Sequence, residues 1–162
     1  MSSTSSKPAP EAEVIAIGCD HAGYPLKAEI LKLLKHMGVP VEDLGCQGSE
    51  ASVHYPIYGK KVVDAVLSRA GARGILICGT GLGMSVIANR FPGIRAALCY
   101  DIFTAIMSRR HNNANLLVLG GRVTGPDLAT EIVRVWLTTP FEGGRHQERL
   151  DLLEKLAAEK HL

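Results

Sequence analysis

One cysteine in this chain is followed directly by three glycines at alternate positions. Cys78 ends the apolar run 74–78, and the glycine-rich segment 79–83 comes next. The apolar run is typical of a strand buried on both faces, and 85–89 reads as the start of a helix. A glycine turn between strand and helix directs several backbone N–H groups at one place, which favours an anion or oxyanion. A thiol beside such donors suits a base that removes a proton next to a carbonyl while the donors hold the enediolate.

The same stretch matches other motifs only in part. Its Gly-x-Gly-x-Gly spacing and its place after the third predicted strand differ from the Gly-x-Gly-x-x-Gly of dinucleotide sites. Met84 stands where a triphosphate-binding loop carries Lys, and a thiol phosphatase needs an Arg closer than Arg90. A structural cysteine before a tight turn stays open as an alternative, because free Cys is among the most buried residue types.

Two other polar segments have residues suited to sugar and proton chemistry. Asp20 and His21 follow the apolar strand 14–18, where they would meet sugar hydroxyls and an anion; an N-cap with a solvated His is the alternative. His111 lies at a turn, where an imidazole passes protons to and from a sugar ring oxygen. The alternative is that the Asn-rich stretch 112–115 only ends a helix.

Two arginines at the start of the last predicted helix suggest a phosphate site. Arg145 and Arg149 are four residues apart and share one helix face near its positive N-terminus. Two like charges there are unfavourable without an anion between them, and guanidinium forks match phosphate geometry. Arg109 and Arg110, in contrast, are expected to form a solvated helix end.

Strands alternate with helices along the chain. The predicted strands are 14–18, 39–44, 74–78, 95–99 and 116–119, and the predicted helices are 24–37, 55–69, the one starting at 85, 101–110, 125–137 and 145–159. Such alternation predicts an α/β protein, a Rossmann-like three-layer α/β/α sandwich with a five-stranded parallel sheet and an extra C-terminal helix. Right-handed crossovers bring all the strand ends, and with them the candidate residues Asp20, His21, Cys78 and Thr80, to one side of the sheet.

Composition and length limit the class of protein. The 162 residues fit a disordered tail, 1–13, and a single domain, 14–162. A formal charge of +2 and 5% aromatic residues argue against nucleic acid, and no apolar segment is long enough to span a membrane. Four separated cysteines without a signal peptide predict reduced thiols in the cytoplasm, and the C-terminal segment 160–162 resembles a peroxisomal address by chance. A metal site at Cys19, Asp20 and His21 is not expected, because the ligand spacing is absent.

Taken together, these segments resemble the ribose-5-phosphate isomerase B family, within the ribose/galactose isomerase group. The matching segments are 18–23, 55–56, 77–85, 88–89, 93–96, 111–112 with 115, 121–125 and 142–146. They run in the family's order from about residue 14 to residue 153 and include nearly everything except the two ends. The resemblance implies a sheet in the order 2-1-3-5-4 and interconversion of ribose 5-phosphate and ribulose 5-phosphate without metal or cofactor.

The resemblance also implies a role for each matching residue. Cys78 is the base that moves the proton between C1 and C2, the backbone of 79–83 holds the enediolate, and His111 opens the furanose ring. Thr80 is the third catalytic residue and lies near the reacting end of the sugar. The substrate-binding residues are Asp20, Tyr55 and Asn112 at the sugar oxygens, Gly79, Gly81, Leu82 and Gly83 at the reacting end, and His21, Arg122, Arg145 and Arg149 at the phosphate. The family is homodimeric, or a dimer of such dimers, and each site is shared between subunits, with His111, Asn112 and Arg122 crossing the interface.

Other functions remain open on the sequence. A six-carbon sugar-phosphate isomerase of the allose 6-phosphate type needs a larger pocket, which the sequence does not give. A non-catalytic sugar-phosphate sensor would keep Arg145 and Arg149 without needing Cys78 and His111 together. A thiol hydrolase would need a base near Cys78, and the sequence offers no clear candidate.

Overall fold

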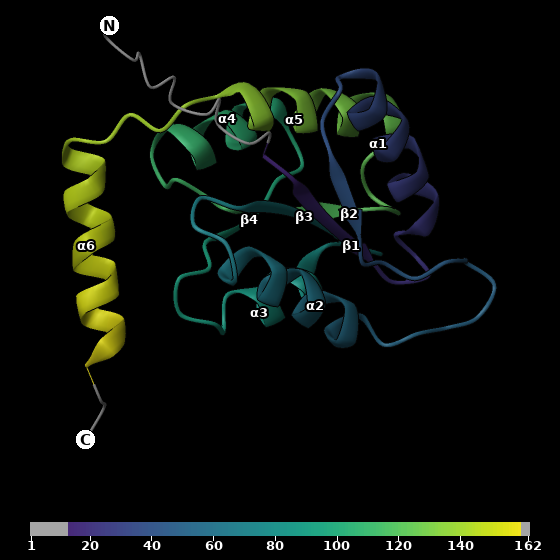
Figure 1. The fold of residues 1–162 in the computed structure, drawn as a ribbon, viewed down its shortest axis with the longest axis horizontal. Coiled ribbons are helices and arrows are strands. Elements are labelled where there is room, and N and C mark those ends of the chain that lie inside the picture. Colours follow the sequence, from purple (N-terminus) through teal and green to yellow (C-terminus); the bar gives the residue numbers. More distant parts are fainter. Residues whose placement is uncertain (1–12, 160–162) are drawn as a thin grey trace, which may run out of the picture.

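Residues 13–159 are described by a computed structural model, in which a single parallel sheet forms the centre (Figure 1). Its strands are β1 (Ile15–Cys19), β2 (Val41–Asp43), β3 (Arg73–Cys78), β4 (Ala96–Leu98) and β5 (Leu116–Gly120). They lie in the order β2-β1-β3-β5-β4, and all neighbouring pairs are parallel. The predicted fold class and the strand order implied by the resemblance are therefore confirmed.

Helices cover both faces of the sheet (Figure 1). They are α1 (Tyr24–His36), α2 (Tyr55–Leu67), α3 (Leu82–Ala88), α4 (Ile102–Arg110), α5 (Pro126–Thr138) and α6 (Arg145–Ala158). Helices α1, α4 and α5 pack on one face, and α2 and α3 on the other. This arrangement gives the expected three layers, with α6 standing to one side of them.

The central strand β3 shows how the sequence pattern builds this core. Ile75 and Ile77 pack into the layer of α1 and α5, whereas Leu76 and Cys78 pack into the layer of α2 and α3. Successive strand side chains point to opposite faces, so an unbroken apolar run fits only a strand covered on both sides. Each such buried aliphatic side chain contributes roughly 1.5–3 kcal/mol to folding.

Several predicted element ends differ from the observed ones. The edge strands are shorter than predicted: 39–44 is reduced to Val41–Asp43 and 95–99 to Ala96–Leu98, because an edge strand has only one neighbour to bond. Helix α3 begins at Leu82 rather than at residue 85, so the turn before it is short. Asp101 caps α4 as predicted, accepting a bond from the Thr104 N–H at 2.7 Å.

The structure describes the chain from residue 13 to residue 159. Residues 1–12 of the predicted tail 1–13 and the address-like segment 160–162 lie outside the described residues. Residue 13 belongs to the described part, where the Glu13 carboxylate accepts two bonds from the Arg73 guanidinium at 2.7 and 2.6 Å. No helix in 13–159 has the length and apolar character needed to cross a membrane.

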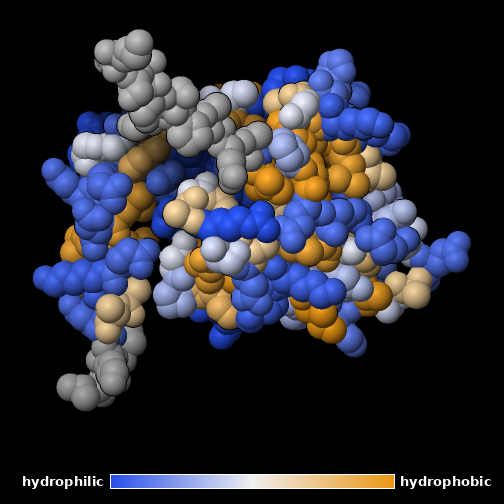
Figure 2. All heavy atoms as spheres, viewed as in Figure 1, coloured by the Kyte–Doolittle hydropathy of each residue, from blue (hydrophilic) through white to orange (hydrophobic). Residues whose placement is uncertain are grey.

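Helix α6 is only partly packed against the domain. Leu150 is buried, while Leu152, Leu153 and Leu156 remain about half exposed. The side of α6 seen in Figure 2 is mainly hydrophilic, as its charged sequence predicts. The exposed leucines therefore form an apolar strip on a helix whose visible side is polar.

Candidate active site

Three loops meet at the carboxyl edge of the sheet and are joined by backbone hydrogen bonds. The Asp20 N–H donates to the Ile77 carbonyl at 3.2 Å, and the Gly121 N–H donates to the Cys78 carbonyl at 2.8 Å. The Arg122 N–H donates to the Gly79 carbonyl at 2.9 Å. Residues after β1, β3 and β5 are thereby held together, as right-handed parallel crossovers require.

The cysteine lies at the bottom of this edge, against the glycine turn. Cys78 is 5% exposed, and the Gly81 N–H donates to its Sγ at 3.2 Å. Gly81 has φ +85°, a left-handed conformation that favours glycine and turns the chain into α3. The sequence therefore predicts correctly that the Cys78 thiol lies next to a backbone N–H of the glycine turn.

Two tyrosines support the turn. A Cβ on Gly83 would lie 2.7 Å from Cζ of Tyr55, so the ring of Tyr55 rests directly on the first turn of α3. The hydroxyl of Tyr100 donates to the Thr80 carbonyl at 2.7 Å, and the Thr80 Oγ1 accepts from the Leu82 N–H at 3.3 Å. Tyr100 had no role in the sequence interpretation; its position directly after β4 was the available signal.

Asp20 and His21 are both held by backbone donors. Asp20 is buried, and its Oδ1 accepts from the Gly23 N–H at 2.9 Å; the N-cap of α1 is Gly23, so Asp20 is not the helix cap. The Nδ1 of His21 accepts from the Val53 N–H at 3.1 Å. A neutral His21 ring therefore carries its proton on Nε2, which leaves that nitrogen as a donor.

Arg122 reaches the glycine turn of its own chain. A Cβ on Gly79 would lie 3.6 Å from both Cδ and Nη1 of Arg122. The expectation that Arg122 crosses from a second subunit is therefore corrected, because the short β5-to-α5 loop already places it beside Gly79.

His111 belongs to a second cluster, formed with residues that precede and begin α6. The rings of His111 and His146 are stacked, with centroids 4.1 Å apart and an interplanar angle of 10°. Glu142 Oε2 lies 3.9 Å from the His111 Nε2 and 3.5 Å from the His146 Nε2, and Arg110 also binds this carboxylate. Glu142 and His146 received no role from the sequence, although both lie in the matched segment 142–146.

The pKa values in this cluster shift in consistent directions. Burial lowers the pKa of His146 below its usual value, and the neighbouring His111 and Arg145 add to the effect. The hydrogen bond from Arg110 lowers the pKa of Glu142. Glu142 is therefore the anion of the cluster, between two imidazoles and a guanidinium.

Three side chains of this cluster carry atoms of the kind that bind metal ions. One atom each from His111, Glu142 and His146 lie within 4.8 Å of one another. However, the two imidazole planes are nearly parallel, so their nitrogen lone pairs do not converge on one point as a tetrahedral metal site requires. In addition, the Glu142 carboxylate already forms an ion pair with Arg110. The arrangement fits a cation–carboxylate cluster better than a metal centre.

The two clusters lie at opposite ends of the parallel strands: Cys78 at the carboxyl end and His111 at the amino end. The Gly74 N–H, near the start of β3, donates to the Asn115 carbonyl, and His111 lies four residues before Asn115 at the end of α4. The strand from Gly74 to Cys78 spans about 13 Å at about 3.3 Å per residue. Within one chain, His111 therefore does not approach Cys78.

The other predicted residues lie with His111 rather than with Cys78. Arg145 and Arg149 are exposed on the first turns of α6, and both add positive charge around His146. Asn112 is exposed and lines a cavity of about 460 Å³ together with Leu150 and Leu153.

A larger cavity of about 730 Å³ lies away from the candidate catalytic groups, and Arg73, Arg95 and Arg109 line it. These arginines are engaged locally: Arg73 donates to the carbonyl of Leu137, Arg95 to that of Asn113 and Arg109 to that of Ala114. They satisfy carbonyls at helix ends, where cations are favoured. The expectation of a solvated Arg109 is wrong, since its side chain is buried for this purpose.

Comparison with known proteins agrees with the geometry. The sequence profile of the Ribose/Galactose Isomerase family matches residues 15–153. The chain is 48% identical to the ribose-5-phosphate isomerase B of Escherichia coli over 139 residues, which are 86% of this chain and 93% of that protein. The solved ribose-5-phosphate isomerase B of Clostridium thermocellum is 53% identical, with a TM-score of 0.85 over 89% of this chain and 97% of that one. The structure from Thermotoga maritima gives 51% identity and the same TM-score over 88% and 98%.

Proposed function

Because this chain belongs to the ribose/galactose isomerase family, we propose that it interconverts ribose 5-phosphate and ribulose 5-phosphate through a cis-enediolate. The observation that carries the proposal is the contact between the Gly81 N–H and the Cys78 sulfur, at 3.2 Å. It combines a base with a backbone donor at the carboxyl edge, where open parallel sheets bind ligands.

The sulfur of Cys78 acts as the base in this proposal. As a thiolate it takes the proton from C2 of the open-chain aldose, and the electron pair moves toward the C1 oxygen to form the enediolate. The C2 hydroxyl proton then moves to the C1 oxygen, and returning the first proton from sulfur to C1 leaves the carbonyl at C2, which gives the ketose. Backbone N–H groups of segment 79–83 stabilise the oxyanion, each contributing on the order of 3 kcal/mol.

Ring opening precedes proton transfer. His111 accepts the proton of the C1 hydroxyl and delivers one to the ring oxygen, a task that suits an imidazole because its two nitrogens can accept and donate protons. Asp20, Tyr55 and Asn112 bind sugar oxygens, and Thr80 lies at the reacting end. The phosphate is bound by His21, Arg122, Arg145 and Arg149.

These roles require two copies of the chain. One chain places Cys78 and His111 at opposite sheet edges, so a complete site needs His111, Asn112, Arg145 and Arg149 from a second subunit. The exposed Leu152, Leu153 and Leu156 on α6 supply apolar surface that a partner would cover. A homodimer with two shared sites is the simplest closed assembly that does this.

The proposal is tested by turnover of ribose 5-phosphate in deuterated water, comparing wild type with Cys78→Ala. We expect wild type to form ribulose 5-phosphate with deuterium at C1, because solvent exchanges with the proton held on the base. The variant is expected to form none while still binding the substrate. A folded wild type that ignores ribose 5-phosphate but converts a six-carbon aldose 6-phosphate would overturn the substrate assignment.

A further inference from the structure

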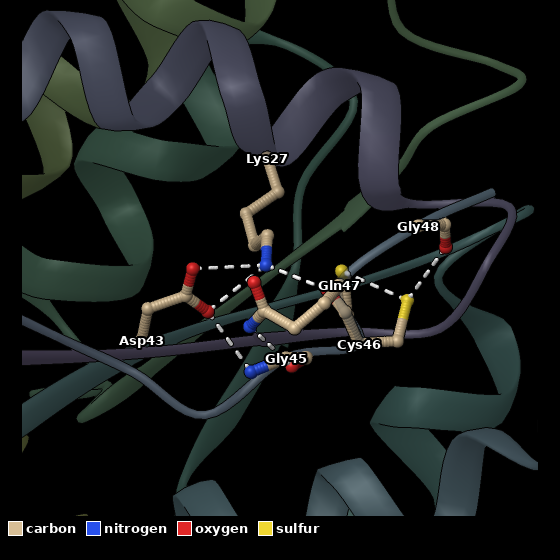
Figure 3. Close-up of polar contacts among 7 residues, drawn as sticks. Lys27, Asp43, Gly45, Cys46, Gln47 and Gly48 are labelled. Atoms are coloured by element: carbon tan, nitrogen blue, oxygen red, sulfur yellow. Dashed lines mark hydrogen bonds and ion pairs between the residues drawn. The ribbon is translucent and has the colours of Figure 1, made fainter.

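Two cysteines outside the proposed catalytic group lie in contact. The Sγ atoms of Cys19 and Cys46 are 3.8 Å apart, although 27 residues separate them in the chain. Figure 3 shows the Cys46 sulfur between the Gly48 carbonyl and the second sulfur. Both cysteines are free and buried.

The backbone around this pair is already placed for a covalent bond. The Cys46 N–H donates to the Cys19 carbonyl at 3.1 Å, which continues the ladder between β1 and the segment after β2. Neighbouring strands lie about 4.8 Å apart, within the Cα separation of about 4.4–6.8 Å that disulfides use. Closing the bond therefore needs side-chain rotation and a small movement of the loop rather than a rearrangement of the fold.

A buried lysine fixes the Cys46 side of the pair. Lys27 Nζ donates to the Cys46 carbonyl at 2.8 Å and to both Asp43 carboxylate oxygens at 3.0 and 2.9 Å (Figure 3). Asp43 also accepts from the Gly45 N–H. This network holds the turn before Cys46 against the end of β1.

The two sulfurs differ in access. Cys46 lines a cavity of about 520 Å³ together with Tyr24 and Tyr58, whereas Cys19 is fully buried behind it. Burial raises the pKa of Cys19 to about 12, so its sulfur stays a thiol at neutral pH. Cys46 is therefore the thiol that a small oxidant in the cavity reaches first. Cys19 is the neighbouring thiol that can then react with the oxidised Cys46.

We infer that Cys19 and Cys46 form an oxidation site, which a hydroperoxide converts to an intrachain disulfide. In the first step the Cys46 sulfur attacks the peroxide, the O–O bond breaks, sulfur gains a hydroxyl, and the thiol proton leaves in water or alcohol. In the second step the Cys19 sulfur attacks the sulfenic sulfur while the Cys19 thiol proton passes to the sulfenic hydroxyl, so no free Cys19 thiolate is needed. The S–S bond forms, the S–O bond breaks, and the Cys19 proton leaves with the hydroxyl as water.

The disulfide has a consequence for the substrate site, and this part rests on the proposed function. Drawing the sulfurs from 3.8 Å to about 2.05 Å shifts the loop that carries Cys46 and breaks the contact from the Cys46 Sγ to the Gly48 carbonyl. Cys19 directly precedes Asp20, and the loop after Cys46 reaches His21 through the Val53 N–H. Oxidation is therefore expected to weaken sugar phosphate binding.

The test is peptide mapping of the intact protein after treatment with hydrogen peroxide. Free thiols are alkylated during unfolding, and the protein is digested without reductant. We expect a linked peptide pair containing Cys19 and Cys46, which dithiothreitol separates. The matched variants are Cys46→Ser, expected to lose the pair, and Cys99→Ser, expected to keep it. Both cysteines recovered as free thiols at a dose that fully oxidises Cys78 would overturn the oxidation site.

Activity tests the consequence separately. Peroxide also reaches Cys78 in every variant, so the informative quantity is the extra loss of wild type relative to Cys46→Ser at the same dose. We expect that extra loss to follow the linked fraction and to reverse with dithiothreitol. Equal losses in the two proteins would overturn the link to binding. Failure of the proposed function appears differently, as an untreated wild type without isomerase activity.

Discussion

Cys78 and His111 lie at opposite ends of the strands in the same parallel sheet. Strand β3 carries Cys78 to the carboxyl edge, whereas His111 ends helix α4, which returns the chain to the amino edge. Any reaction that uses both side chains on one substrate must therefore combine two chains.

Subunit mixing tests this directly. Cys78→Ala and His111→Asn are each expected to be inactive on ribose 5-phosphate, but refolding them together should restore activity. Half of the dimers are then mixed, and each mixed dimer has one intact site, so about one quarter of wild-type activity should return. The control mixes Cys78→Ala with Asp20→Asn, two changes at the same sheet edge, and should restore nothing. Recovery in the control, or none in the first mixture, would contradict shared sites.

Gly83→Ala tests the contact between α3 and Tyr55. The added methyl would lie 2.7 Å from the Tyr55 ring, so the ring or the first turn of α3 must shift. Since a displacement of about 1 Å in an active site lowers the reaction rate by up to about 10²-fold, kcat/KM should fall by roughly 10- to 100-fold. Circular dichroism should stay unchanged, because Ala favours a helix. Gly125→Ala is the control, as its Cβ meets no atom within 4 Å; similar kinetics in both variants would discount the contact.

Arg149→Ala tests the phosphate clamp. Loss of a charge-assisted hydrogen bond costs about 1.5–3 kcal/mol, so KM for ribose 5-phosphate should rise roughly 10- to 100-fold. Unphosphorylated ribose, which cannot use the clamp, should react as slowly as it does with wild type. Arg134→Ala removes an exposed arginine that pairs with Glu131 and should leave KM unchanged. An unaltered KM in Arg149→Ala would place this side chain outside the clamp.

The lowered pKa of His146 predicts that the free energy of unfolding depends on pH. Because burial lowers its pKa in the folded protein, the unfolded chain binds its proton first as the pH falls. Its contribution is complete above the ordinary His pKa of about 6.5 and is lost as the pH falls toward the lowered value. Urea midpoints measured between about pH 8 and about pH 5 should fall less for His146→Gln than for wild type. His36→Gln, which alters an exposed histidine, should keep the wild-type slope; equal slopes in all three proteins would refute the assignment.

The sequence was sufficient for the fold because the apolar runs and helical spacings are strong local signals. Ile75 and Ile77 on one side of β3, with Leu76 on the other, follow directly from an unbroken apolar strand. The turn at Gly81 and its bond to Cys78 also follow from the strand–glycine–helix order. The predicted strand ends differ from the observed ones where a strand has a single neighbour, as β2 and β4 do.

What the sequence could not give were the consequences of tertiary packing. From the sequence, Arg109 is expected to lie in solvent at the end of a helix. Its side chain is instead buried, because it donates a hydrogen bond to the Ala114 carbonyl. The contact between Cys19 and Cys46 depends on how the segment after β2 continues along β1, which no local pattern encodes. Arg122 was expected from another subunit, and only the path of its loop showed otherwise.

The backbone bonds that join the loops after β1, β3 and β5 also bear on how this scaffold changes specificity during evolution. Main-chain donors and acceptors such as Asp20 with Ile77, or Gly121 with Cys78, persist whatever side chains the loops carry. Because the three loops are bonded to one another, an insertion in one of them is expected to displace the other two. The segment before α2 is attached differently, through the Val53 N–H and the side chain of His21. Changes in length there are the ones that selection for a longer sugar would accept most readily.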